Sequence, residues 1–241
     1  METNIDRRAF DRRLYLAASI LFPLLMLVGF GRTYYLKAVF GTPPLSSGLV
    51  HVHGILMTAW ILLFIAQIRL VATKRLQLHR QLGYAAIALA VLMVVVGVPT
   101  ALRAAKYGAP SNPAGIPPLG FLVVPLFDLL MFVGLFAAAI SYRRQPAAHK
   151  RLMLLTAINF LPPALGRIHV ASLVALGPLW FFGFPTLLAL LCLGLDRRRH
   201  GRVNPAFATG TGLLVASYVI RLALLPTSAW LSVATWLTSF V

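Results

Sequence analysis

Long apolar runs alternate with short basic segments along the sequence. An α-helix needs about 17 to 25 mostly apolar residues to cross the ~30 Å hydrocarbon core of a bilayer. Runs of that length lie at 14–30, 48–72, 80–102, 119–141, 151–172, 174–195 and 209–225. The pattern predicts an all-α, polytopic membrane protein with seven transmembrane helices, one for each run. We expect a single integral-membrane domain over residues 1–241, with its core at 48–225.

The two ends of the chain differ from this core. Residues 1–13 form a charged leader, and the run 14–30 lacks the small-residue cleavage site of a signal peptide, which predicts an uncleaved first span. The tail 226–241 is short for a span, and its Trp230 and Trp236 are typical of the membrane interface. We expect a short interfacial helix there, with an eighth crossing as the alternative.

Lysines and arginines are divided unevenly between the loops. Sixteen of the 22 lie in the leader and in the loops near residues 69–80, 143–151 and 197–202, which share one side of a seven-helix protein. Four lie on the other side, and Arg167 and Arg221 fall within spans. Because cytoplasmic loops are enriched in Lys and Arg, we expect the N-terminus inside, the C-terminus outside, and anionic lipids at the cytoplasmic face.

The composition excludes several classes of protein. Hydrophobic residues make up 59% of the chain, charged residues only 11%, and the mean hydropathy is +0.84. The net charge of +17 comes from clusters between spans, where orientation and lipid explain it, so we predict no nucleic-acid partner. With Cys192 as its one cysteine, the chain has no intramolecular disulfide or cysteine-based metal site.

The motifs of common hydrolases and phosphoryl-transfer enzymes are missing. The sequence contains no G-x-S-x-G, no H-E-x-x-H, no glycine-rich phosphate loop and no pair of intramembrane carboxylates. A non-enzymatic membrane protein is therefore the first expectation, and electron transfer is the one enzymatic alternative that we retain.

One stripe of residues is regular enough to orient the second helix. His53, Met57, Trp60, Phe64 and Gln67 recur at spacings of four and three, which places them on one helix face. We expect this face to point into the bundle. Packing is the ordinary explanation for the methionine and the aromatic residues, whereas His53 needs a polar partner at that depth.

A second group of polar residues falls in the outer halves of the predicted helices: Asp128, Arg167, His169 and Arg221. One carboxylate cannot neutralise two guanidinium groups. Either Asp128 pairs with one arginine while the other reaches the headgroups, or the surplus cation serves an outward-facing pocket for an anionic or lipid-like ligand. From helix depth we predict the pair Asp128–Arg167, with Arg221 left to anchor the ligand. His53 and Trp60 complete the predicted pocket.

Two basic turns with a histidine open helices from the cytoplasmic side. These are LHRQLGY at 78–84, with His79, and AHKRLML at 148–154, with His149. The two histidines are either parts of lipid-binding interfacial turns or a pair of ligands. His200, in RRRHGR, is expected to lie in a solvated turn.

The motifs HGILMTAW, LHRQLGY, PLFDLLMF and AHKRLMLL, followed by Arg167, resemble an uncharacterised family of bacterial polytopic inner-membrane proteins. The resemblance covers about residues 48 to 225. It implies a multi-pass protein of the bacterial inner membrane and no assigned activity. It singles out the positions His53, Trp60, His79, Asp128, His149 and Arg167.

A weaker similarity is to transmembrane di-haem cytochromes b, in which paired histidines hold one haem b near each membrane face. It implies His53 and His169 as the outer ligands and His79 and His149 as the inner ligands. This chain departs from that pattern because His79 and His149 stand at the openings of their helices. We predict no copper or zinc site, since the histidines lack cysteine or paired carboxylate partners.

Overall fold

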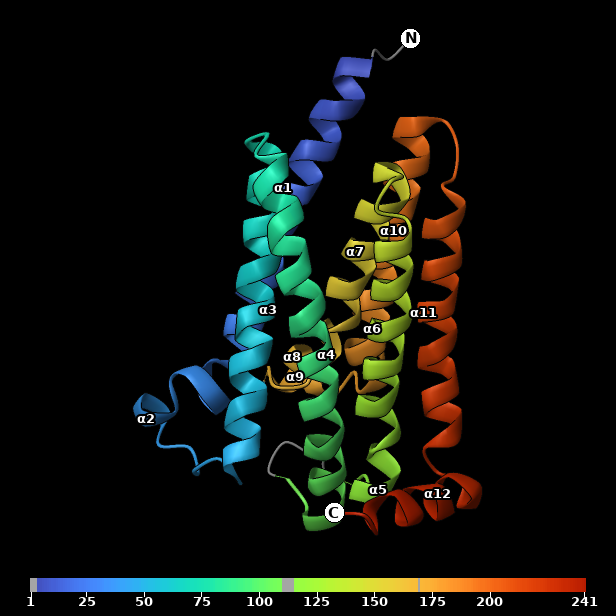
Figure 1. Cartoon of the computed structure of the whole chain (residues 1–241). Coiled ribbons are helices and arrows are strands. Elements are labelled where there is room, and N and C mark those ends of the chain that lie inside the picture. Colours follow the sequence, from blue (N-terminus) through green and yellow to red (C-terminus); the bar gives the residue numbers. More distant parts are fainter. Residues whose placement is uncertain (1–3, 110–114, 169) are drawn as a thin grey trace.

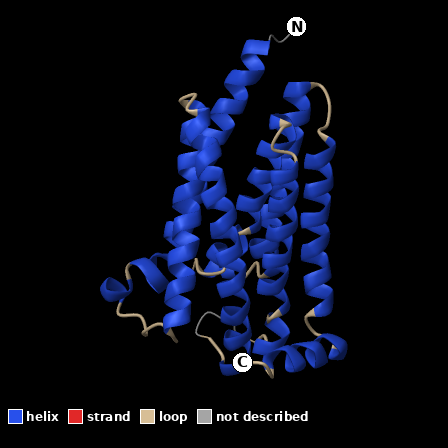
Figure 2. Cartoon of the chain, in the orientation of Figure 1, coloured by secondary structure: helices blue, strands red, loops and turns tan. Residues whose placement is uncertain are grey.

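The computed structural model describes residues 4–109, 115–168 and 170–241, and within these ranges every regular element is helical (Figures 1 and 2). The elements are α1 (Asn4–Phe30), η1 (Gly31–Tyr35), α2 (Lys37–Phe40), α3 (Gly48–Ala72), α4 (Leu76–Tyr107), α5 (Pro118–Phe121), α6 (Val123–Ser141), α7 (Pro146–Asn159), α8 (Leu161–Leu165), α9 (Ala171–Val174), η2 (Leu179–Gly183), α10 (Phe184–His200), α11 (Pro205–Leu224) and α12 (Ser228–Thr238). The predicted all-α class is confirmed.

Six segments are long and apolar enough to cross a membrane, and each coincides with a predicted run. They are Ala9–Tyr35, Gly48–Ala72, Leu76–Tyr107, Pro118–Ser141, Leu179–His200 and Pro205–Leu224. The predicted span 151–172 is not one helix, because α7 ends at Asn159 and α8 covers only Leu161–Leu165. Pro162 and Pro163 explain the break, since proline cannot donate a backbone hydrogen bond and its ring clashes with the preceding turn.

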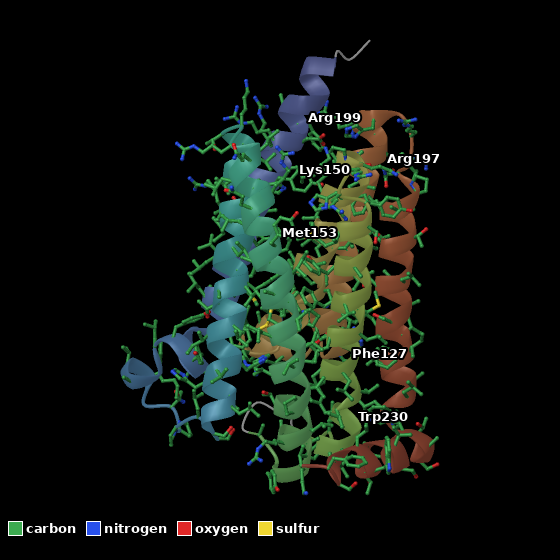
Figure 3. All side chains as sticks on the ribbon, viewed as in Figure 1. Phe127, Lys150, Met153, Arg197, Arg199 and Trp230 are labelled. Atoms are coloured by element: carbon green, nitrogen blue, oxygen red, sulfur yellow. The ribbon has the colours of Figure 1, made fainter. Side chains whose placement is uncertain are left out.

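The longer helices run side by side between two ends of the bundle (Figure 1). The end that holds the N-terminus also holds the α3–α4, α6–α7 and α10–α11 connections, and Lys150, Arg197 and Arg199 lie there (Figure 3). We call it the basic end. The C-terminus and α12 lie at the other end, the far end, where α12 runs across the ends of neighbouring helices. This arrangement of α12 agrees with the predicted interfacial tail.

The charged leader belongs to the first helix. Helix α1 begins at Asn4, so the charged residues 6–13 continue directly into the first span. Further along, α1 packs against α3 and α8. The approach to α8 requires Gly29, since a Cβ at this position would overlap the backbone of Ala164.

The core has two main parts. The larger cluster contains buried side chains of α6, α7 and α11, among them Val123, Leu155 and Leu214. The second joins α3 and α4 to α6 through an aromatic cluster that includes Trp60 and Phe132. In the predicted stripe of α3, Trp60 and Phe64 are buried, which confirms that this face points inward.

Candidate functional sites

Asp128 and Arg221 form a buried ion pair within the bundle. Arg221 Nη1 lies 2.5 Å from Asp128 Oδ1, and the arginine side chain has no exposed surface. Arg221 Nη2 also donates to Ser217 Oγ at 3.3 Å. The guanidinium is 5.1 Å from the centre of the Tyr218 ring and 5.8 Å from that of Phe127. The carboxylate and these rings enclose the cation.

The predicted Asp128–Arg167 ion pair is therefore wrong, and Arg221 is not the surplus cation. Helix α11 packs on α6 and α7, which brings Arg221 to Asp128. The helix is interrupted just before Pro162, and the short helix α8 packs against α1 instead. Helical depth alone did not reveal which neighbouring helix each arginine faces.

Arg167 follows α8 and has a different environment. Its Nη1 donates to the backbone oxygen of Pro163 at 2.7 Å, and its guanidinium stands 4.5 Å from the centre of the Phe30 ring. Among the side chains that the structure describes, no carboxylate forms an ion pair with it. Because Asp128 pairs with Arg221, Arg167 has no carboxylate counter-ion among the described side chains.

His53 lies within the electrostatic reach of Arg167. Its Nδ1 is buried, and no group in the described part of the chain forms a hydrogen bond with it. His169, the predicted partner of His53 in an outer haem site, lies outside the described residues. His53 Nδ1 has no hydrogen-bond partner and Arg167 has no carboxylate partner among the described residues, and the two residues interact electrostatically.

Trp60 has a packing role. Its ring meets those of Phe132 and Phe136 edge to face, with ring centres 5.0 and 5.4 Å apart. The six residues predicted for one pocket therefore do not form a single site. Asp128 and Arg221 form an ion pair, Trp60 packs against aromatic rings, and Arg167 interacts electrostatically with His53. His169 lies outside the described residues.

His79 and His149 come together at the basic end, although 70 residues separate them in the sequence. Their ring centres are 6.3 Å apart, and the ring planes are inclined by 82°. His149 Nδ1 is 2.8 Å from the backbone oxygen of Ala139. Because a carbonyl oxygen only accepts, Nδ1 carries the proton, which leaves Nε2 of His149 as an acceptor or a ligand.

The imidazole of His79 interacts with the backbone of Gln67. Its Nδ1 is buried and has no hydrogen-bond partner among the residues described here. Arg80 is close enough to interact with the ring electrostatically. The two imidazoles, one from each basic turn, are therefore available as a pair of nitrogen ligands.

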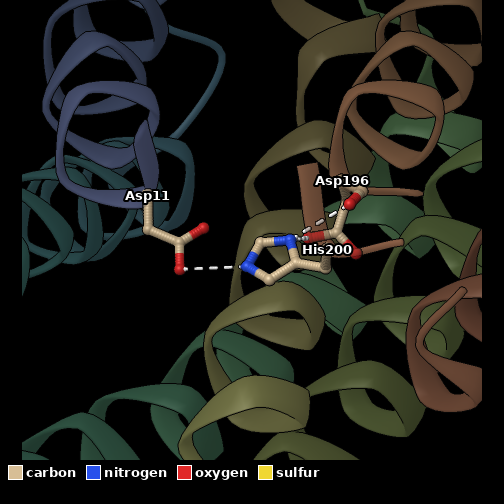
Figure 4. Close-up of side chains that lie close together, drawn as sticks. All are labelled: Asp11, Asp196 and His200. Carbon is tan, nitrogen blue, oxygen red and sulfur yellow. Dashed lines mark hydrogen bonds and ion pairs between the residues drawn. The ribbon is translucent and has the colours of Figure 1, made fainter. Parts of the chain in front are cut away.

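A network of charged residues that the sequence analysis missed ties α1, α7 and α10 together at the basic end. His200 Nε2 lies 3.5 Å from Asp11 Oδ2, and its Nδ1 lies 3.2 Å from Asp196 Oδ1 (Figure 4). Arg151 Nε donates to the same oxygen of Asp196 at 2.8 Å, and Lys150 pairs with Asp11.

The expectation that His200 lies in a solvated turn is wrong, because its side chain is mostly covered by these partners. The spacing of four between Asp196 and His200 on one helix was the signal that could have shown it. Ligand atoms of Asp11, Asp196 and His200 lie within 4.8 Å of one another. Lys150 and Arg151 already balance the two carboxylates, so we interpret the cluster as an ion network that joins three helices.

Comparison of the chain with protein-family models, with curated proteins and with solved structures gave no match.

Proposed function

We propose that this membrane protein would hold a b-type haem between His79 and His149 and would serve in electron transfer at the membrane. The observation that carries the proposal is the facing pair of imidazoles at the basic end, 6.3 Å apart between ring centres. When bound, haem would supply reversible one-electron transfer, and His79 and His149 would hold it through neutral imidazole nitrogens.

The two imidazoles come from different helices, and their ring centres are 6.3 Å apart, so both rings could ligate one iron. Edge-to-face aromatic packing also spans such distances. The bond between His149 Nδ1 and the Ala139 carbonyl favours ligation, because metal-binding histidines usually donate their other N–H to such an acceptor.

The chemistry around the pair also suits this cofactor. Arg80 lies within electrostatic reach of His79, and a guanidinium can hold a propionate. The weaker similarity to di-haem cytochromes b implies His79 and His149 as the inner of its two ligand pairs, although both stand at the openings of their helices. The histidine pair and Arg80 together support the proposal of one haem at the basic end.

An absorbance spectrum of protein purified from haem-replete cells tests the proposal. We expect a Soret band near-stoichiometric with the chain, lost in His79→Ala and in His149→Ala. His51→Ala, which removes an exposed histidine of α3, serves as the control and should retain the band. A colourless protein that gains no band after hemin is added would refute the proposal, and loss of the band in His53→Ala alone would move the site to the other end.

A second candidate function is the binding of a small anionic or lipid-like ligand by Arg167 and His53. Arg167 has no carboxylate partner among the described side chains, and the neighbouring His53 Nδ1 is buried without a hydrogen bond. A carboxylate or phosphate would neutralise the first group and accept a hydrogen bond from the second. Intramembrane ionisable groups of this kind usually face a functional site.

Thermal stability in detergent, measured with and without acetate, citrate or phosphate, tests this second function. We expect one of these anions to raise the melting temperature of the wild type and to leave Arg167→Gln unchanged. Arg103→Gln, at the far end of α4, controls for loss of one positive charge. An equal rise in both variants would show general salt stabilisation instead.

For the topology, we propose seven crossings of a bacterial inner membrane with the N-terminus inside. The position of the chain ends at opposite ends of the bundle supports an odd number of passages, and we assign the passage beyond the six long segments to α7 and α8 (Figure 1). A reporter active only outside the cytoplasm should work after Val241 and stay silent after Gln145. Silence at both sites would indicate six or eight crossings.

A further inference from the structure

A groove lies between α3 and α4 next to their connection at the basic end. Its volume is about 400 Å³, and Leu70, Leu78 and Leu82 provide most of its wall. Arg69 and Arg75 stand in the same lining, and both are exposed. The groove therefore joins an apolar surface to two guanidinium groups.

A second hollow, of about 390 Å³, adjoins the groove. It shares Arg75 and Leu78 with the groove, and its other lining residues include Lys74, Gln77 and Gln81. The apolar groove and this polar hollow thus meet at Arg75. A ligand that occupied both would have an apolar part, an anionic centre and a polar end.

The turn that carries these cations is well defined. Arg75 N donates to the backbone oxygen of Leu70 at 2.8 Å, and Thr73 Oγ1 donates to that of Arg69 at 2.9 Å. Lys74 has a left-handed φ of 62°. These bonds hold the three basic residues of the turn close together.

Among the described side chains, no carboxylate forms an ion pair with these cations. The sequence has no Asp or Glu between Asp11 and Asp128, and in the described part of the structure the ion pairs of Asp11, Asp128 and Asp196 go to other residues. Exposed cations at a membrane surface bind lipid phosphate. The leucine side chains that line the groove would gain no favourable contact from an inorganic anion.

We propose that an anionic phospholipid binds here, with its phosphate between Arg69 and Arg75. Its acyl chain lies along Leu70, Leu78 and Leu82, and its polar headgroup enters the hollow beside Gln77 and Gln81. The lining residues do not include His79 or His149, and lipid binding here does not require haem.

Titration of the full chain in detergent with phosphatidylglycerol, followed by native mass spectrometry, tests the site. Each basic residue near a lipid surface contributes about 1 kcal/mol, so Arg69→Gln combined with Arg75→Gln should weaken binding roughly 30-fold. Arg143→Gln combined with Arg144→Gln is the matched control, since these arginines are exposed in the α6–α7 turn. We expect the control to bind phosphatidylglycerol like the wild type. Measuring the melting temperatures of the two double variants checks that both are folded.

Two further measurements distinguish binding of a whole phospholipid from binding of its phosphate group alone. Inorganic phosphate at the lipid concentration should not displace phosphatidylglycerol, and Leu78→Gln, which retains both arginines, should weaken lipid binding. If the double variant at Arg69 and Arg75 and the control double variant at Arg143 and Arg144 lose lipid affinity equally, the proposal is overturned. Such a result would show that lipid is attracted by the overall positive charge of this end. Displacement by phosphate, equal binding of zwitterionic phosphatidylcholine, or no lipid bound to the wild type would also overturn it.

Discussion

Arg221 and Arg167 are both arginines among apolar helices, yet their surroundings differ. Arg221 is fully buried and pairs with Asp128 at 2.5 Å. Arg167 has a backbone carbonyl and the Phe30 ring as partners, and no carboxylate among the described side chains. A charge inside a membrane protein is costly unless it is paired. The first arginine is therefore part of the structural core, and the second is the better candidate for a functional site.

The largest expected effect comes from breaking the closed pair. Asp128→Asn leaves the buried Arg221 without a counter-charge, which typically costs about 3–5 kcal/mol. We expect a large fall in the melting temperature in detergent. Adding Arg221→Met should restore most of the loss, because the pair is then removed as a unit. Adding Arg167→Gln should restore nothing, and recovery in that variant would reassign the partner of Asp128.

Burial should also determine which of the two acidic residues of the ion network contributes more to the free energy of unfolding. The side chain of Asp196 is 6% exposed and that of Asp11 is 19% exposed. Asp196→Asn weakens the bonds from Arg151 and should lower the free energy of unfolding by about 1–3 kcal/mol. Asp11→Asn affects a more solvated pair and should cost about 0.2–1 kcal/mol. Chemical denaturation of both variants measures the difference, and equal losses would contradict a role for burial.

Contact between α1 and α8 determines where Arg167 lies, and Gly29 controls it. Gly29→Ala places a methyl group against the backbone of Ala164 and should cost about 1–3 kcal/mol. Gly134→Ala is the control, because no atom of another residue lies within 4 Å of its Cβ position. This variant should be neutral or, from helix propensity, up to about 1 kcal/mol more stable. Similar destabilisation by both variants would contradict the close approach.

The smallest change in stability is expected for Arg167→Gln. It removes a hydrogen bond and a ring contact, but it also removes a charge that has no carboxylate partner, so the net loss should stay below about 1 kcal/mol. Arg221→Gln, which isolates Asp128, should cost clearly more in the same melting experiment. If the two losses are equal, Arg167 has a structural role like that of Arg221.

Much of the fold was predictable, because hydropathy and helix length are local properties. The six apolar segments, the inward face with Trp60 and Phe64, and the helix 228–238 across the far end agree with the sequence pattern. The run 151–172 was predicted as one helix, and its apolar pattern did not show that the double proline 162–163 splits it into α7 and α8.

The candidate sites were less predictable, since each depends on contacts between distant helices. The basic turns pointed to His79 and His149, but their approach to 6.3 Å depends on how α4 and α7 are placed. Nothing in the run LDRRRH indicated that Asp196 meets Arg151 or that His200 meets Asp11.

By itself, the sequence determined the helical class, the apolar segments and the gathering of basic residues at one end, because each follows from composition over one helix or one turn. Only the tertiary structure decided that Asp128 pairs with Arg221, which is 93 residues away, and that Arg167 turns to α1. One carboxylate and two arginines permit either pairing. The packing of α11 on α6 selects one of them, because an ion pair needs contact and the sequence does not state which helices are in contact.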